Sequence, residues 1–360
     1  MNRNGVFSID WGIFIPVIIL VVLGLTTLFS INVSFFKTQL IYVIFSIFVF
    51  IIFSNVNYKI LQFYSLPIYI TSIFVLLFVL FLGIESRGAV RWIDIFGVRI
   101  QFSEIFKPFL LVSFASFLNT RKNYSFKNFL IIIALLFPVF FLIYLQPDLG
   151  NALIYAGVAL FTLITFGFPL LWFAVGFILL GLLFPFIWHF LHDYQKQRVL
   201  TFINPSHDPL GSSYNVIQSM VAVGSGMFFG KGLGEGTQSA LRFLPERHTD
   251  FIFATFSEEF GFVGGLVIIL SFAFLLYKIF LIFSNSDDKF CKVFSMSAFF
   301  LILTQLFFNI GMNVGLLPIV GVTLPFVSFG GSSILSNFIL LGFLSSISRS
   351  YKNKKILEIG

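Results

Sequence analysis

The sequence has little charge for its length. Only 10% of its 360 residues are charged, whereas 58% are hydrophobic and the mean hydropathy is +1.00. A soluble domain carries about 25% charged residues. This chain could not cover a surface in water, so most of it must lie in lipid.

Cysteine and histidine are also scarce. The single cysteine, Cys291, excludes a disulfide within the chain and a cysteine-based metal cluster. None of the four histidines has the spacing of a zinc motif. The sequence therefore indicates no metal site built from these residues.

Basic residues exceed acidic ones, which gives a net charge of +7. They stand between apolar runs or at the chain ends, so the positive-inside rule explains them better than a nucleic-acid surface does. Short segments rich in lysine and arginine face the cytoplasm if the N-terminus is there. We predict that both termini are cytoplasmic and that nucleic acid is not a partner.

Stretches without charge mark the membrane spans. They cover residues 11–36, 38–58, 60–84, 108–120, 128–147, 149–192, 260–277 and 293–348. A helix needs about 20 residues to cross the hydrocarbon. Each of the two longest stretches therefore holds two helices, broken near 167–169 and between Pro318 and Pro325.

The short stretches at 108–120 and 260–277 become full spans only if their helices begin near Ser103 and Asp250. The number of predicted transmembrane helices is then about ten. We predict an all-α integral membrane protein that forms one polytopic domain over residues 1–360. A balanced polar segment at 192–250, with five basic and five acidic residues, is expected to fold as a large extracytoplasmic loop between helices 7 and 8.

Ionisable residues inside membrane spans are expensive and are candidates for function. Glu104 and Lys107 are three residues apart, so they share one helix face and can pair. A structural ion pair and a functional one have equal weight here. Asp250 precedes an apolar helix, where an N-cap is the favoured interpretation and a base of raised pKa is the alternative.

Two further acids, a glycine-rich segment and a helix-breaking stretch are also candidates for a functional site. Glu258 and Glu259 would lie about 80° and 180° from Asp250 around a helix, so both cannot serve one site with it. The glycine-rich segment 224–236 contains Lys231 but lacks the spacing of a Walker loop. It remains either a backbone able to approach a pyrophosphate or, more simply, a surface loop. The helix-breaking stretch 318–333 indicates either a cavity or a surface turn.

Taken in order, these segments resemble the SEDS family (shape, elongation, division and sporulation). The matching stretches are Arg91-Trp92, 101–107 (QFSEIFK), 146–150 (QPDLG), 197–198 (QR), 202–205 (FINP), 214–215 (YN), 218–219 (QS), 230–232 (GKG), 236–238 (GTQ), 244–253 (LPERHTDFIF), 258–261 (EEFG) and 324–333 (LPFVSFGGSS). The resemblance runs from about residue 10 to 349. The stretches 236–238 and 309–312 favour the RodA branch over the FtsW branch. Phe102 and Phe329 depart from the proline and tyrosine usual in the family.

The resemblance implies a peptidoglycan glycosyltransferase that polymerises lipid II at the outer face of the bacterial cytoplasmic membrane during cell elongation. It reverses the preference at Asp250, which becomes the expected catalytic base. Glu104, Lys107 and Glu258 become expected cavity residues. The phosphates of the leaving group could be held by positive side chains or by a divalent cation, Mg²⁺ or Mn²⁺. The expected phosphate contacts are Arg198, Lys231 and Arg242.

The resemblance also implies partners: a class B penicillin-binding protein and the cell-elongation complex. Two other functions fit the same helices and polar cavity. A lipid II flippase would not need a carboxylate at the outer mouth. A non-catalytic scaffold would tolerate loss of the whole polar cluster. A generic transporter is less consistent with the sequence, which lacks an internal repeat.

Overall fold

The computed structural model describes residues 10–86, 89–95, 97–121, 123–191, 193–204, 208–209, 211 and 213–359. The short basic segments behind the predicted orientation include Arg3, Lys122 and the side chains of Lys352, Lys354 and Lys355, which lie outside these ranges. So do His192, Pro205 and His207 of the predicted extracytoplasmic loop.

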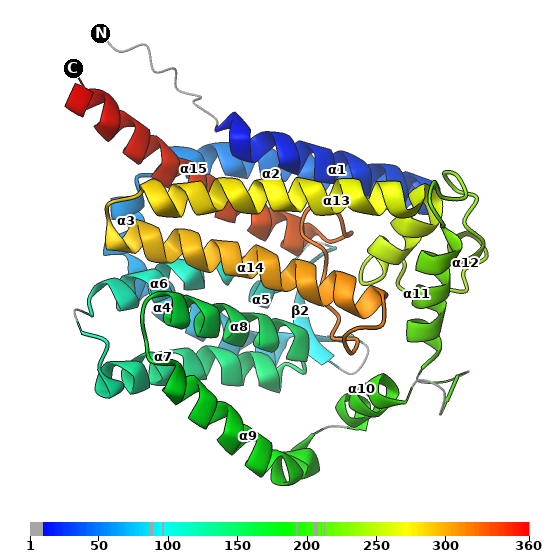
Figure 1. The fold of residues 1–360 in the computed structure, drawn as a ribbon, viewed down its shortest axis with the longest axis horizontal. Coiled ribbons are helices and arrows are strands. Elements are labelled where there is room, and N and C mark those ends of the chain that lie inside the picture. Colours follow the sequence, from blue (N-terminus) through cyan, green and yellow to red (C-terminus); the bar gives the residue numbers. More distant parts are fainter. Residues whose placement is uncertain are drawn as a thin grey trace.

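Nearly parallel helices make up most of the fold (Figure 1). In chain order they are α1 (Trp11–Ile31), α2 (Val33–Asn55), α3 (Tyr58–Phe63), α4 (Ser65–Leu82), α5 (Phe102–Ile105), α6 (Lys107–Asn119), α7 (Phe126–Leu145), α8 (Leu149–Thr165), α9 (Leu170–Phe190), α10 (Asp193–Ile203), α11 (Tyr214–Ser225), α12 (Thr237–Ala240), α13 (Ile252–Asn285), α14 (Lys289–Asn313) and α15 (Gly331–Ile359). Helices α11 and α12 gather at one end of the bundle, and α1 begins at the other end (Figure 1).

The predicted membrane spans are present. Within the described ranges, eight helices are long and apolar enough to cross a bilayer: α1, α2, α4, α7, α9, α13, α14 and α15. The 17-residue α8 is a shorter apolar helix, and α5 and α6 follow each other at the predicted span that begins near Ser103. The number of spans is thus roughly consistent with the ten predicted. The chain is a multi-pass membrane protein.

The predicted helix breaks are confirmed, with one difference in extent. Helix α8 ends at Thr165 and α9 begins at Leu170, where Gly167 adopts a positive φ of 90°. The second break is wider than predicted, because α14 ends at Asn313 and α15 begins only at Gly331.

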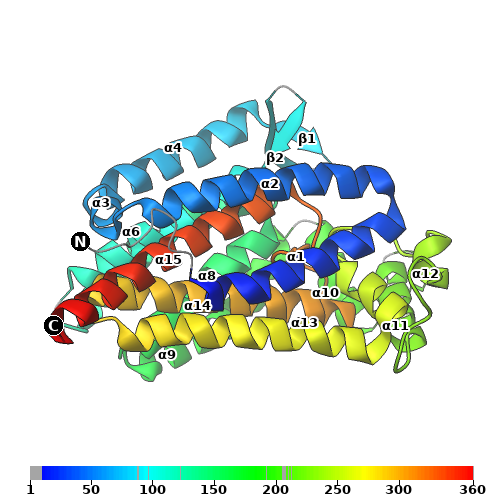
Figure 2. The same ribbon diagram turned by 90° about the horizontal axis from the view of Figure 1, so that it is seen from above.

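A small antiparallel sheet lies between α4 and α5, and the sequence analysis did not predict it. Its strands are β1 (Ile84–Ser86), β2 (Ala89–Ile95) and β3 (Val98–Ile100), paired in the order β1-β2-β3. Figure 2 shows β1 and β2 at the end of α4. Two of the strands have only three residues, which is too short for a clear alternation of polar and apolar side chains.

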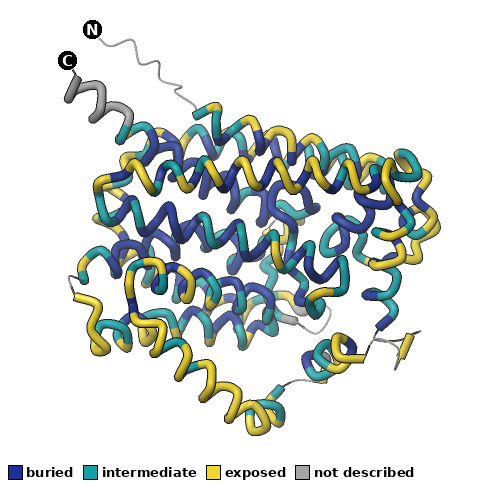
Figure 3. Tube along the Cα trace, in the orientation of Figure 1, coloured by how far each residue is buried: buried dark blue, intermediate teal, exposed yellow. Residues whose placement is uncertain are grey.

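Burial is uneven across the bundle. Helix α15 packs closely on α2, where Gly342 leaves no room for a side chain beside Phe50 and Phe53. In contrast, no residue of α9 is buried, and this helix stands apart from the others as a largely exposed rod (Figure 3). Its apolar surface fits contact with lipid rather than with protein.

Helix α13 is interrupted at Gly261, where the backbone adopts φ 65° and ψ −162°. The carbonyls of Glu258 and Glu259 would bind the N–H groups four residues later in a continuous helix. Instead they accept hydrogen bonds from the backbone of Lys231 and Gly232, both at 3.0 Å. The N–H groups of Phe262 and Val263 donate to the carbonyls of residues 227 and 228 at 2.9 and 3.1 Å. The glycine-rich segment therefore fills the break in α13, a structural role that was not considered from sequence.

The interrupted helix gives a testable prediction. A Cβ at Gly261 would lie 2.3 Å from the backbone nitrogen of Gly230, and a non-glycine residue held at such a φ costs about 1–3 kcal/mol. We expect Gly261→Ala to lower the thermal unfolding midpoint of the purified protein clearly. Gly176→Ala in α9 is the control, because nothing lies within 4 Å of its Cβ and alanine favours a helix by about 1 kcal/mol. Equal midpoints for the two variants would contradict the proposed close approach.

Candidate functional site

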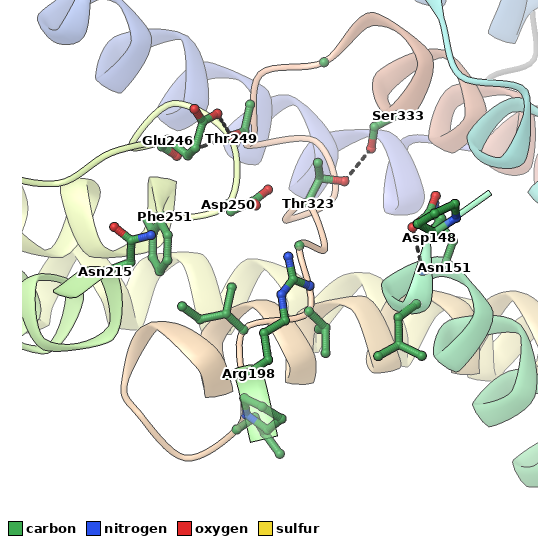
Figure 4. A pocket seen from close by; sticks show the side chains of 18 of the residues that line it. Asp148, Asn151, Arg198, Asn215, Glu246, Thr249, Asp250, Phe251, Thr323 and Ser333 are labelled. Carbon is green, nitrogen blue, oxygen red and sulfur yellow. Dashed lines mark hydrogen bonds between the residues drawn. The ribbon is translucent and has the colours of Figure 1, made fainter. Parts of the chain in front are cut away.

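A cavity of about 750 Å³ opens within the bundle near the α11 end. Its polar lining comes from the segment from β2 to α5, the start of α8, helices α10 and α11, the segment just before α13, and the segment that leads from α14 into the start of α15. Figure 4 shows the side chains of 18 of the residues that line it. The charged ones are Arg91, Glu104, Asp148, Arg198, Glu246 and Asp250.

Asp250 lies in the wall of this cavity, immediately before α13 (Figure 4). The N-cap of α13 is Phe251, so Asp250 stands one residue before the cap position. Opposite the carboxylate, a Cβ at Gly321 would stand 3.6 Å from Oδ2. The glycine therefore leaves space beside the carboxylate.

The loop that carries Asp250 is tied to the segment before α15. The backbone N–H of Phe329 donates to the carbonyl of His248 at 2.9 Å, and the hydroxyl of Ser328 donates to the carbonyl of Thr249 at 2.8 Å. The ring of His248 stacks on Phe35, with the two ring centres 4.4 Å apart. Both loops are thereby fixed against each other at the cavity wall.

Glu104 and Lys107 form the predicted ion pair. The Lys107 Nζ lies 2.7 Å from the Glu104 Oε1, and both residues are buried. Glu104 lines the cavity whereas Lys107 stands behind it, outside the lining. The other oxygen of Glu104, Oε2, has no hydrogen-bond partner among the described residues. The Lys107 ammonium thus neutralises the buried Glu104 carboxylate at the edge of the cavity.

A second buried carboxylate, Asp148, was missed as a site residue. Its Oδ2 accepts hydrogen bonds from the side chains of Gln101 at 2.7 Å, Asn151 at 2.8 Å and Ser103 at 3.2 Å. Arg91 Nη1 lies 3.9 Å from its Oδ1. The available signal was an acid directly before an apolar helix, since Asp148 is the N-cap of α8.

Of the three predicted phosphate contacts, the structure brings one into the cavity. Figure 4 shows the side chain of Arg198 reaching into it from α10. Lys231 and Arg242 are not among the lining residues. Lys231 pairs with Glu258 at 3.1 Å, and Arg242 is exposed.

Glu258 lies outside the cavity lining and binds the polar segment between α11 and α13 instead. It is fully buried. Besides Lys231, it accepts hydrogen bonds from the backbone N–H groups of Gln238 and Ser239 at 2.9 and 3.0 Å, and from the hydroxyls of Ser239 and Thr237. Its neighbour Glu259 bonds to the hydroxyl of Ser30. Neither acid therefore joins Asp250.

Among the described residues, no group of three or more histidine, cysteine, aspartate or glutamate side chains is placed to hold a metal ion. The described residues thus offer no cage built from protein side chains alone for such an ion, whereas Mg²⁺ commonly uses only one or two carboxylates together with substrate phosphates.

Comparisons with known proteins agree with this architecture. The family model for FtsW, RodA and SpoVE, described as cell cycle protein, matches residues 7–353. Peptidoglycan glycosyltransferase MrdB of Escherichia coli (strain K12) is 40% identical over 293 residues, which cover 81% of this chain and 78% of MrdB. Stage V sporulation protein E of Bacillus subtilis (strain 168) is 35% identical over 326 residues, 88% of each chain.

Solved structures show the same fold. A chain from a peptidoglycan synthase complex that coordinates polymerization and crosslinking superposes with a TM-score of 0.84 and 27% identity, over 96% of this chain and 99% of the other. Rod shape determining protein RodA of Thermus thermophilus superposes with a TM-score of 0.74 and 24% identity, over 96% and 98%. The protein belongs to the SEDS family of RodA, FtsW and SpoVE proteins.

Proposed function

We propose that this protein is a peptidoglycan glycosyltransferase that polymerises lipid II into glycan strands during cell elongation. The observation that carries the proposal is Asp250, a carboxylate in the wall of a polar cavity that also contains two arginines. The 40% identity to peptidoglycan glycosyltransferase MrdB supports the same activity. The RodA branch of the family fits best because MrdB is more similar than the FtsW relatives described as probable glycosyltransferases, which are 33–35% identical.

The proposed reaction is one displacement. The acceptor sugar hydroxyl gives its proton to the carboxylate of Asp250 as its oxygen bonds to the anomeric carbon of the donor. The bond from that carbon to the phosphate oxygen breaks, and undecaprenyl pyrophosphate leaves with the electron pair. A pyrophosphate is already a good leaving group, so a single base is the main requirement, and such help contributes about 10²–10⁴-fold.

The leaving pyrophosphate needs positive charge close by. Arg91 and Arg198 are the arginines that line the cavity within the described ranges. The planar fork of an arginine suits phosphate oxygens, and charge placed where it develops stabilises the transition state. We therefore propose Arg198 and Arg91 as the phosphate contacts. Arg198 was expected from the sequence, and Arg91 replaces Lys231 and Arg242.

We place the chain in the bacterial cytoplasmic membrane with both termini in the cytoplasm and residues 192–250 outside. The distribution of lysine and arginine supports this orientation. It puts Asp250 at the outer mouth of the bundle, on the side where lipid II is polymerised.

Asp250 provides the first prediction of this function. Asp250→Asn keeps the size of the side chain but cannot take a proton, so the rate of lipid II polymerisation should fall by about 10²–10⁴-fold. Glycan length on a gel and binding of lipid II by the purified protein measure the two effects. Binding should remain. Glu235→Gln, an exposed acid outside the cavity lining, is the matched control and should retain full activity.

If Asp250→Asn polymerises lipid II within a few-fold of the parent, Asp250 is not the base. Glu104 would then be the next candidate, and Glu104→Gln in the same assay tests it. A flippase or a scaffold would retain its function in Asp250→Asn, so the same variant separates the proposed enzyme from both alternatives.

The orientation is testable by cysteine labelling. In a Cys291→Ser background, Asp208→Cys should react with a membrane-impermeant reagent in intact cells. Asn123→Cys, in the loop between α6 and α7, should react only after lysis. The reverse pattern would refute the proposed topology.

A partner is the third expectation. The similar chain of known structure comes from a complex that couples polymerization to crosslinking, and we propose a class B penicillin-binding protein of the cell-elongation complex as the partner of this chain. Coexpression followed by affinity purification should yield a complex, and the transpeptidase should raise the polymerisation rate. No complex, together with an unchanged rate, would refute the partner.

A further inference from the structure

Two asparagines of α14, Asn309 and Asn313, lie one helical turn apart and are fully buried. The side-chain nitrogen of each donates to the backbone carbonyl of Asp250, at 3.0 Å in both cases. Each amide has a second N–H. That of Asn309 reaches the carbonyl of Val322 at 2.7 Å, and that of Asn313 reaches the carbonyl of Asn309 at 2.7 Å. All four N–H groups of the two amides therefore have acceptors.

The acceptor oxygen of Asn313 extends this connection to α13. It accepts a hydrogen bond at 3.1 Å from the N–H of Ala254, one of the N-terminal amides that a helix leaves without an internal partner. Ser219 of α11 donates to the carbonyl of Asn313 at 2.9 Å. One side chain thus links the Asp250 peptide, the start of α13 and, through its backbone, α11.

These hydrogen bonds satisfy backbone carbonyls that apolar side chains could not satisfy. The carbonyls of Asp250 and Val322 belong to two irregular segments inside a helix bundle, where an unsatisfied carbonyl is costly. A primary amide can donate to two carbonyls at once, which Asn309 does here. Because Gly321 beside Val322 faces the Asp250 carboxylate, Asn309 fixes the distance between the carboxylate and the opposite cavity wall.

We propose that Asn309 and Asn313 are positioning residues for glycosyl transfer. They hold the peptide of Asp250 so that its carboxylate points at the acceptor hydroxyl as that hydroxyl attacks the donor. The inference rests on the proposed function, in which Asp250 removes the proton. Neither asparagine is among the residues that line the cavity, so their effect passes through Asp250.

The chain offers a matched control on the same helix. Gln305 lies one turn before Asn309, is fully buried, and has no hydrogen-bond partner for its side-chain oxygen or nitrogen among the described residues. Gln305→Leu removes a buried amide that holds nothing in place. Asn309→Leu and Asn313→Leu remove the two that hold Asp250. Asn309→Ser keeps one donor and serves if the leucine variant fails to fold.

Initial rates over a range of lipid II concentrations separate positioning from binding. We expect kcat to fall by about 10²-fold in Asn309→Leu, the loss that a displacement of about 1 Å produces. KM should change by less than about threefold, because substrate contacts remain. Gln305→Leu should keep both constants within about threefold. An equal fall of kcat in Gln305→Leu would overturn the inference.

A second readout does not depend on polymerisation. In a Cys291→Ser background, the thiol introduced by Asp250→Cys can be alkylated, and its rate reports how the side chain at 250 is presented. Adding Asn309→Leu should change this rate by about tenfold, because thiol reactivity follows its surroundings, whereas adding Gln305→Leu should not. Equal rates would overturn the positioning role. A parent that binds lipid II without polymerising it would instead refute the proposed function.

Discussion

Five consecutive backbone carbonyls, those of residues 246–250, need hydrogen-bond donors at the mouth of an apolar bundle. Inside a membrane protein an unsatisfied carbonyl costs several kcal/mol. The donors come from separate parts of the chain: the N–H of Thr249, the hydroxyl of Thr255, the N–H of Phe329, the hydroxyl of Ser328 and the amides of Asn309 and Asn313. Satisfying this one loop therefore fixes α13, α14 and the segment before α15 relative to one another, and the cavity follows from that arrangement.

The same constraint organises the polar segment between α11 and α13. Glu258 is fully buried and would be unstable there as a lone carboxylate, yet the start of α12 and Lys231 surround it with donors. The carboxylate thereby anchors the segment to α13. Charges that looked similar in the sequence have different tasks: Asp250 faces the cavity, whereas Glu258 holds the structure beside it.

Local patterns made much of the fold predictable. Runs without charge located the helices, and the spacing of Glu104 and Lys107 predicted their pairing, because both depend on residues close in the chain. The pairing of Lys231 with Glu258 depends on how the glycine-rich segment folds back onto α13, and the spacing of the two residues in the sequence does not predict it. Asn309 entered only as part of a family pattern, and Asn313 was not considered. Two amides one turn apart in an apolar helix were the overlooked signal, since each must find partners.

The glycine-rich segment 226–232 joins the break in α13 through four backbone hydrogen bonds, which involve residues 227, 228, 231 and 232, beside the ion pair of Lys231 with Glu258. At Gly230 a Cβ would collide with the carbonyl of Glu259, 2.1 Å away, so that position admits only glycine. The exposed side chains of Met227 and Phe229 take no part in the docking. The side chain can therefore vary at Phe229, and at Met227 among residues that tolerate its positive φ of 47°. The number of residues between Gly226 and Gly232 cannot vary, because a single insertion or deletion would misalign all four bonds at once.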